Sequence, residues 1–147
     1  MSKRKPKQRT YRDPRGWIKQ RMSLAADQLR DIGVPCHLAI EAMRTGHGNQ
    51  GEAWGILAGS VNVALLMAEA GIGKEFIADI KQAQAALMRS KARAEKTGVW
   101  AFDGEGYNAV AAVIDLHEQQ LAEGNVGVIE RALHEVRRRI DADEVLA

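Results

Sequence analysis

Cysteine and proline are both scarce in this sequence of 147 residues. Cys36 is the only cysteine, so no disulfide can form within the chain, which suits a reducing compartment. No proline follows Pro35, so none interrupts helices over the rest of the chain. The longest apolar run, Val63–Ala68, is too short to cross a bilayer, and no apolar stretch follows the basic N-terminus as a secretory signal requires. We therefore expect a soluble, cytoplasmic protein that does not enter a membrane.

Patterns that indicate catalysis or metal binding are also missing. The four histidines are His37, His47, His117 and His134. No two of them stand four residues apart on a helix, and there is no His-Glu-x-x-His motif or cysteine–histidine cluster. The sequence has no nucleophile elbow, no Walker loop and no close carboxylate pair on an apolar helix face. We therefore expect a protein that is not an enzyme and that uses neither a metal nor a cofactor.

Positive charge, by contrast, is concentrated at the N-terminus. Residues 1–21 hold nine lysines and arginines and one acid, Asp13, for a charge of +8, whereas the remainder carries −6. The first 16 residues show no apolar periodicity and include two prolines, so they offer little apolar surface to offset the entropy of ordering. We expect residues 1–16 to be a flexible basic arm and residues 17–147 to be a single domain.

The arm combines cations with aromatic rings, as segments that bind nucleic acid do. Cations attract phosphates and an aromatic ring stacks on a base, so such binding depends steeply on salt. The candidate contacts to phosphate, nucleotide or nucleic acid are Lys3, Arg4, Lys5, Lys7, Arg9, Tyr11, Arg12, Arg15 and Trp17. The alternative interpretation is a solvated tail, or one that lies on the acidic body or on a neighbouring subunit.

Beyond the arm, apolar residues recur at spacings of three and four, which predicts helices with one buried face. No stretch alternates as a strand would, and the connections are short, so the pattern predicts an all-α antiparallel bundle of five to six helices. The helices are expected from Gly16 to a cap at Gly33, from Pro35 to Arg44, from Asn49 or Glu52 to Gly71, from Lys74 to Lys96, from Asp103 to Gly124, and from Asn125 to about Ile140.

The third of these helices is the most apolar and is expected to be central. Met22 in the first helix, Phe76 in the fourth, and Leu133 and Ile140 in the sixth are all expected to face the core. The short apolar link 99–102 has the composition of a strand, yet nothing else in the chain offers it a partner strand.

One glycine-rich segment, Gly46–Gly51, matches the G-x-G-x-x-G pattern. The dinucleotide fingerprint requires a strand before the loop, whereas a helix precedes this one, so a Rossmann site is excluded. Free amides at the start of the next helix could still hold an anion. The candidate residues for that anion loop are His47, Gly48, Asn49 and Gly51. The pattern favours a flexible turn between helices.

A second pair of glycines, Gly55 and Gly59, lies one turn apart in the third helix and leaves a groove for a close helix neighbour. In a water-soluble protein this spacing more often reflects tight internal packing. The excess of alanine and glycine over bulky residues also fits a homo-oligomer. Asn62, among apolar neighbours, needs a hydrogen-bond partner if it is buried.

Several short motifs resemble those of small helical proteins encoded in bacterial prophages. Lys3-Arg4-Lys5 leading to Tyr11-Arg12 is similar to their KRKYRP opening. The later motifs are Val61-Asn62, Gly71 and Gly73, Thr97-Gly98, His117-Glu118-Gln119-Gln120-Leu121 and Glu130-Arg131-Ala132-Leu133. The resemblance implies a phage accessory protein in a bacterial cytoplasm that sequesters or inhibits a host target, such as a defence component or a nucleotide signal. The alternative is an accessory protein that binds nucleic acid through its arm.

Overall fold

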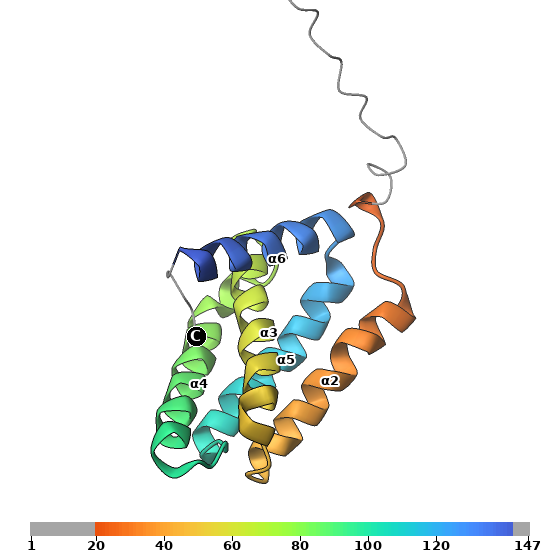
Figure 1. Ribbon diagram of the computed structural model, residues 1–147. Coiled ribbons are helices and arrows are strands. Elements are labelled where there is room, and N and C mark those ends of the chain that lie inside the picture. The colour runs from red at the N-terminus through yellow and green to blue at the C-terminus, as the bar shows by residue number, and fades with distance from the viewer. Residues whose placement is uncertain (1–19, 143–147) are drawn as a thin grey trace, which may run out of the picture.

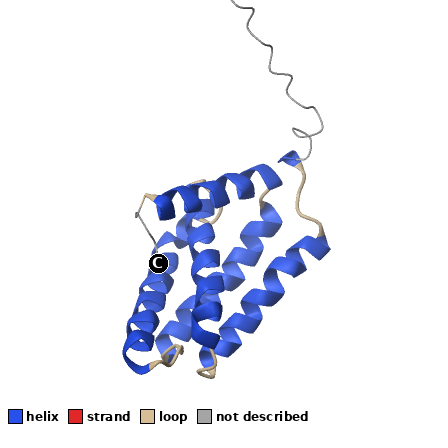
Figure 2. Ribbon diagram, in the orientation of Figure 1, coloured by secondary structure: helices blue, strands red, loops and turns tan. Residues whose placement is uncertain are grey.

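Five helices make up the bundle in the computed structural model, which describes residues 20–142. They are α2 (Ala26–Arg44), α3 (Glu52–Glu69), α4 (Ile77–Thr97), α5 (Gly104–Glu123) and α6 (Val126–Asp141), with short 3-10 turns at Asn49–Gly51 and Lys74–Phe76. Helices α2 to α5 run alternately up and down, and α6 lies across one end of them (Figure 1). Between residues 20 and 142 there is no strand, only an isolated bridge between Ser23 and Asn125 (Figure 2). The predicted all-α antiparallel bundle is confirmed.

Helix α3 is the central element, as its composition predicts. It packs against α2, α4, α5 and α6, and every residue from 61 to 68 is buried. Asn62 is among them at 4% exposure, and its Oδ1 accepts a hydrogen bond of 3.1 Å from Gln84 Nε2. None of the described helices is both long and apolar enough to cross a membrane.

Two predictions near the start of the domain are wrong. A single helix, α2, runs through Gly33 and Pro35 instead of breaking between them. Gly33 is no cap: it is buried, and a Cβ there would lie 3.0 Å from Glu118 Oε1, so its bare backbone makes room for α5. Helix α2 is continuous there despite the hydrogen bond that proline removes.

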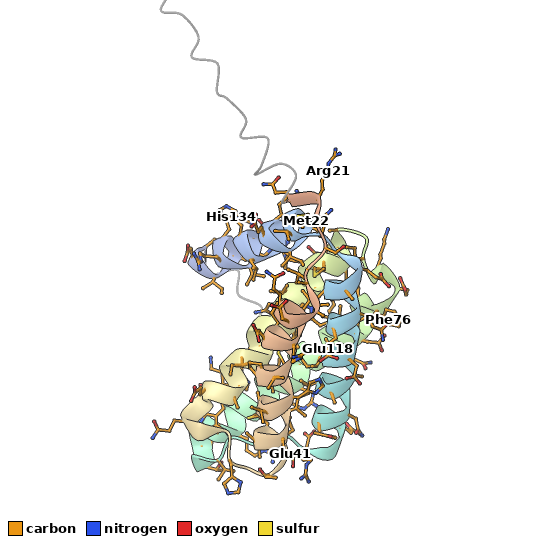
Figure 3. The ribbon with its side chains drawn as sticks, turned by 90° about the vertical axis from the view of Figure 1, so that its right-hand side faces the viewer. Arg21, Met22, Glu41, Phe76, Glu118 and His134 are labelled. Carbon is orange, nitrogen blue, oxygen red and sulfur yellow. The ribbon has the colours of Figure 1, made fainter. Side chains whose placement is uncertain are left out.

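Residues 22–25, directly before α2, are not helical, although residues 20 and 21 are. Met22 is 57% exposed, and its carbonyl accepts a hydrogen bond of 3.0 Å from the amide of Val126. The Met22 backbone is therefore hydrogen-bonded to the turn between α5 and α6 rather than within a helix. Figure 3 shows Met22 beside the start of α6.

Three further side chains expected in the core lie at the surface. Phe76, Leu133 and Ile140 are 40%, 53% and 50% exposed. Leu133 and Ile140 belong to α6, which meets only the end of the bundle, so a narrow stripe of that helix is enough to cover it. That stripe contains Ile129, Ala132 and Val136.

Local signals place the start of α5 and α6 correctly. Asp103 Oδ1 accepts a hydrogen bond of 2.6 Å from the amide of Gly106, and Asn125 Oδ1 accepts one of 2.9 Å from Val128. Each is a side-chain cap that satisfies a free amide at a helix N-terminus. These caps fix where α6 turns across the bundle.

Candidate functional site

The loop before α3 is held by the link that follows α4. A Cβ at Gly48 would lie 2.5 Å from Trp100 Cβ, and one at Gly51 would lie 3.0 Å from the Trp100 ring. Trp100 in turn packs beside Trp54, with ring centroids 6.0 Å apart. The glycines are therefore the small residues that let Trp100 lie against the loop.

Two backbone amides of this loop donate hydrogen bonds inside the protein. The His47 amide donates to the Ala42 carbonyl at 2.8 Å, and the Gly51 amide donates to the Gly48 carbonyl at 3.3 Å. His47 Nδ1 lies 3.1 Å from Thr45 Oγ1. Asn49 begins the 3-10 turn. The contacts give the loop a structural role as a connecting turn, and an anion site there stays a prediction.

The structure does not describe the other candidate site, the basic arm. All nine of its candidate contacts, from Lys3 to Trp17, lie outside residues 20–142.

An open hollow lies at the corner where α6 crosses α2, α3 and α5. Its volume is about 390 Å³. We call it the corner pocket and define it by six of its lining residues: Ile32 of α2, Gly55, Ile56 and Gly59 of α3, and Leu133 and Val136 of α6. The elements that form it are far apart in the sequence and meet because α6 turns across the bundle (Figure 1).

The floor of the corner pocket is bare helix backbone. A Cβ at either Gly55 or Gly59 would have no atom within 4 Å. The groove that these glycines predict is therefore real, but no helix of the described chain fills it. The expectation that it serves tight internal packing is wrong.

Aliphatic side chains stand around this floor and remain partly exposed. Ile32 and Ile56 are each 37% exposed, and Leu133 is 53% exposed. The one hydroxyl in the lining, Ser60 Oγ, donates to the Ile56 carbonyl at 3.0 Å and lies 3.2 Å from Cys36 Sγ. The lining polar group is thus satisfied within the protein, and the surface offered to a partner is apolar.

Among the described residues, His117 is the only titratable one in the lining of the corner pocket. Burial lowers the pKa of its imidazole, although the hydrogen bond with Gln120 works in the other direction. Its Nδ1 lies 3.3 Å from Gln120 Oε1, and Gln120 Nε2 donates to the carbonyls of Ala64 and Ile72. The His117 imidazole is therefore hydrogen-bonded within the core, and the described lining places no second titratable group beside it. The pocket is thus suited to binding by shape and apolar contact rather than to acid–base chemistry.

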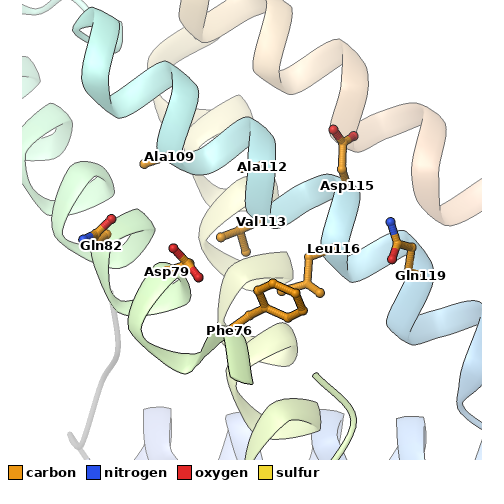
Figure 4. A pocket seen from close by; sticks show the side chains of 9 residues that line it. All are labelled: Phe76, Asp79, Gln82, Ala109, Ala112, Val113, Asp115, Leu116 and Gln119. Atoms are coloured by element: carbon orange, nitrogen blue, oxygen red, sulfur yellow. The ribbon is translucent and has the colours of Figure 1, made fainter. Parts of the chain in front are cut away.

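A second hollow, of about 360 Å³, lies between α4 and α5. Figure 4 shows the Phe76 ring lying next to Leu116, with the Asp79 carboxylate beside it. Its walls bring together charged, amide and apolar side chains, and no glycine is among its lining residues. It has neither the bare backbone nor the continuous aliphatic rim of the corner pocket.

The sequence predicts part of the corner pocket and misses the rest. The spacing of Gly55 and Gly59 predicts a groove, but the periodicity of α6 places Leu133 in the core instead of at the rim. Comparison of the chain with protein-family models, curated proteins and solved structures found no match. The geometry of the described residues therefore carries the functional argument.

Proposed function

We propose that this protein is a non-enzymatic binding protein that acts as a homodimer formed through the corner pocket. The observation that carries the proposal is the open floor at Gly55 and Gly59 within a partly exposed aliphatic rim. Apolar surface of this kind gains free energy when a partner removes it from water. The dimer is the form in which the chain would bind its target.

A second copy suits this surface because the surface is self-complementary. In a twofold dimer the same patch lies on both sides of the interface, so it must contain both a projection and a recess. Leu133 and Ile56 project, and the floor at Gly59 is recessed. The absence of a Cβ at Gly55 and Gly59 also lets two α3 backbones approach closely.

Sedimentation velocity of the full chain tests the dimer. We expect the wild type to be dimeric and Leu133→Glu to be monomeric with unchanged helix content, because the carboxylate would be buried at the interface. Met88→Glu is the matched control: Met88 is also an exposed apolar residue, at 46%, but lies on α4 outside the pocket lining. A wild-type chain that stays monomeric up to its solubility limit would refute the dimer.

For the target, the sequence favours a phosphate-bearing ligand. A twofold dimer carries two copies of the basic N-terminal segment, with nine cations within residues 1–21 of each chain. Two linked basic segments bind one polyanion more tightly than one does, because the second contact is intramolecular. The resemblance to prophage proteins suggests a nucleotide signal or a defence component of a bacterial host as the target to be sequestered, with nucleic acid as the alternative.

Calorimetry with a panel of cyclic and linear nucleotides, together with retention on DNA and RNA at low salt, separates these targets. Binding of one nucleotide class supports sequestration of a signal, and retention lost on deletion of residues 1–15 supports nucleic-acid binding. If the nucleotides give no heat and retention is the same without residues 1–15, both phosphate targets are excluded. The oligomeric state is measured separately, so the two halves of the proposal fail independently.

A further inference from the structure

Three metal-binding side chains meet on the surface where α2 packs against α5. His37 projects from α2, and Asp115 and Glu118 project from α5 one turn apart. One donor atom from each lies within 4.8 Å of the other two. His37 Nε2 is 2.5 Å from Glu118 Oε1. The cluster is separate from the corner pocket, so its chemistry is independent of the proposed function.

The packing of α2 on α5 fixes this cluster. Gly33 and His37 are four residues apart and therefore lie on the same side of α2. The Glu118 carboxylate lies beside Gly33. A Cβ added at Gly33 would lie only 3.0 Å from Glu118 Oε1. Figure 3 shows Glu118 between the two helices, and Figure 4 shows Asp115 pointing away from Phe76, on the side of α5 toward α2.

We propose that His37, Asp115 and Glu118 form a three-ligand site for a divalent transition-metal ion, with Zn²⁺ as its best-suited occupant. One imidazole and two carboxylates are ligands that Zn²⁺ accepts, and three protein ligands leave a fourth position for water. Ca²⁺ and Mg²⁺ prefer larger sets of oxygen ligands and rarely take imidazole.

The geometry requires only small movements for binding. Ligands that bind one ion at bond lengths of about 2.1 Å lie at most about 4 Å apart. Rotation of exposed side chains closes the longest separations, and the ion takes the place of the hydrogen bond between His37 and Glu118. The hollow beside the pair, of about 370 Å³, gives an ion and its water access. The imidazole and both carboxylates are supplied by helices that the fold already holds together.

Calorimetric titration of the full-length chain with Zn²⁺, after removal of any histidine tag, tests this site. We expect one Zn²⁺ per chain and no heat with Mg²⁺. His37→Ala and Glu118→Gln should each remove the Zn²⁺ heat, and Asp115→Asn should weaken it. The control is His134→Ala, which removes an exposed histidine of α6 far from the cluster (Figure 3) and should leave binding unchanged.

Structural damage by a variant is distinguished from loss of a ligand by the circular dichroism spectrum and the melting temperature. Each variant should fold without metal, because the three side chains are exposed. Zn²⁺ should raise the melting temperature of the wild type and of His134→Ala but not that of His37→Ala. Absence of binding to the wild type, equal binding of Mg²⁺, or undiminished Zn²⁺ binding by folded His37→Ala would each overturn the proposal.

Discussion

Two pairs of glycines only a few residues apart have opposite environments. Gly48 and Gly51 lie against Trp100, where any Cβ would clash, whereas a Cβ at Gly55 or Gly59 would meet nothing within 4 Å. The first pair is required for the fold of one chain. The second pair costs helix stability, since glycine in a helix interior is less favourable than alanine, and it makes no close contact with the other described residues, 20–142. In the proposed dimer, the open groove at Gly55 and Gly59 accommodates the partner chain.

Among the variants that test this comparison, Gly48→Ala should have the largest effect on the free energy of unfolding. The new methyl group would lie 2.5 Å from Trp100 Cβ and 2.8 Å from Met43 Sδ, in a part of the core that cannot widen without moving the backbone link. We expect the free energy of unfolding to fall by about 2–3 kcal/mol, at the upper end for overpacked sites. Urea denaturation followed by circular dichroism measures it.

Gly104→Ala is the control for that variant, because a Cβ at Gly104 has no atom within 4 Å. Its unfolding free energy should change little. If Gly48→Ala were as stable as Gly104→Ala, the packing of Trp100 against the loop would not be needed for the fold.

Gly59→Ala should act in the opposite direction on the single chain. Alanine has the higher helix propensity and clashes with nothing, so the unfolding free energy should rise by about 0.5–1 kcal/mol. Measurement in a Leu133→Glu background removes the contribution of dimer formation to stability. With Leu133 intact, the same methyl group should fill the recess and weaken dimerisation.

Higher stability of the single chain together with weaker dimerisation is expected only if Gly59 lies at the interface. A decrease in the stability of the monomeric background would show that Gly59 is required within the chain. Unchanged dimerisation, on the other hand, would place the interface elsewhere.

The smallest effect on stability is expected from removal of an ion pair in α6, the helix that forms one wall of the corner pocket. Arg138 and Arg139 lower the pKa of Glu135 from 4.5 to about 2, and Arg139 also pairs with Glu69 of α3 at 3.0 Å. Because the folded-state pKa is the lower one, this contribution to stability is present above pH 4.5 and is lost as the pH falls toward about 2.

Glu135→Gln should therefore slightly lower the melting temperature at neutral pH, and the difference from wild type should shrink as the pH falls through that range. The carboxylate is partly exposed to solvent, so salt should also reduce the difference. The packing of Gly48 on Trp100 involves no charge, and the effect of Gly48→Ala should not follow this pH dependence. A difference for Glu135→Gln that grows in acid would contradict the assignment.

Local signals in the sequence are enough for much of the fold. The apolar composition of α3, the start of α5 at Asp103 and the turn at Asn125 before α6 depend on neighbours within one or two helical turns, and they are predicted correctly. Gly33 and Pro35 predict a break between two helices, yet α2 continues through them, and Glu118, distant in the sequence, lies beside Gly33.

The candidate sites were predictable only in part for the same reason. The spacing of Gly55 and Gly59 predicts a groove, but only the crossing of α6 shows that it is open and that Leu133 stands at its rim. The proposed metal site has no sequence signal, because His37 and Glu118 are 81 residues apart and meet only when α2 packs on α5.

Disulfide cross-linking at residue 59 is the most direct test of a dimer formed through the α3 groove. In a Cys36→Ala background, two α3 helices that cross at Gly59 should bring two copies of Gly59→Cys close enough for a disulfide. The added side chain weakens the dimer as Gly59→Ala does, but oxidation traps the dimer that still forms. Oxidation should then produce a covalent dimer, whereas Gly104→Cys in the same background should stay monomeric on a non-reducing gel. A Gly59→Cys chain that dimerises in solution but does not cross-link, or that cross-links no more than Gly104→Cys, would contradict the account.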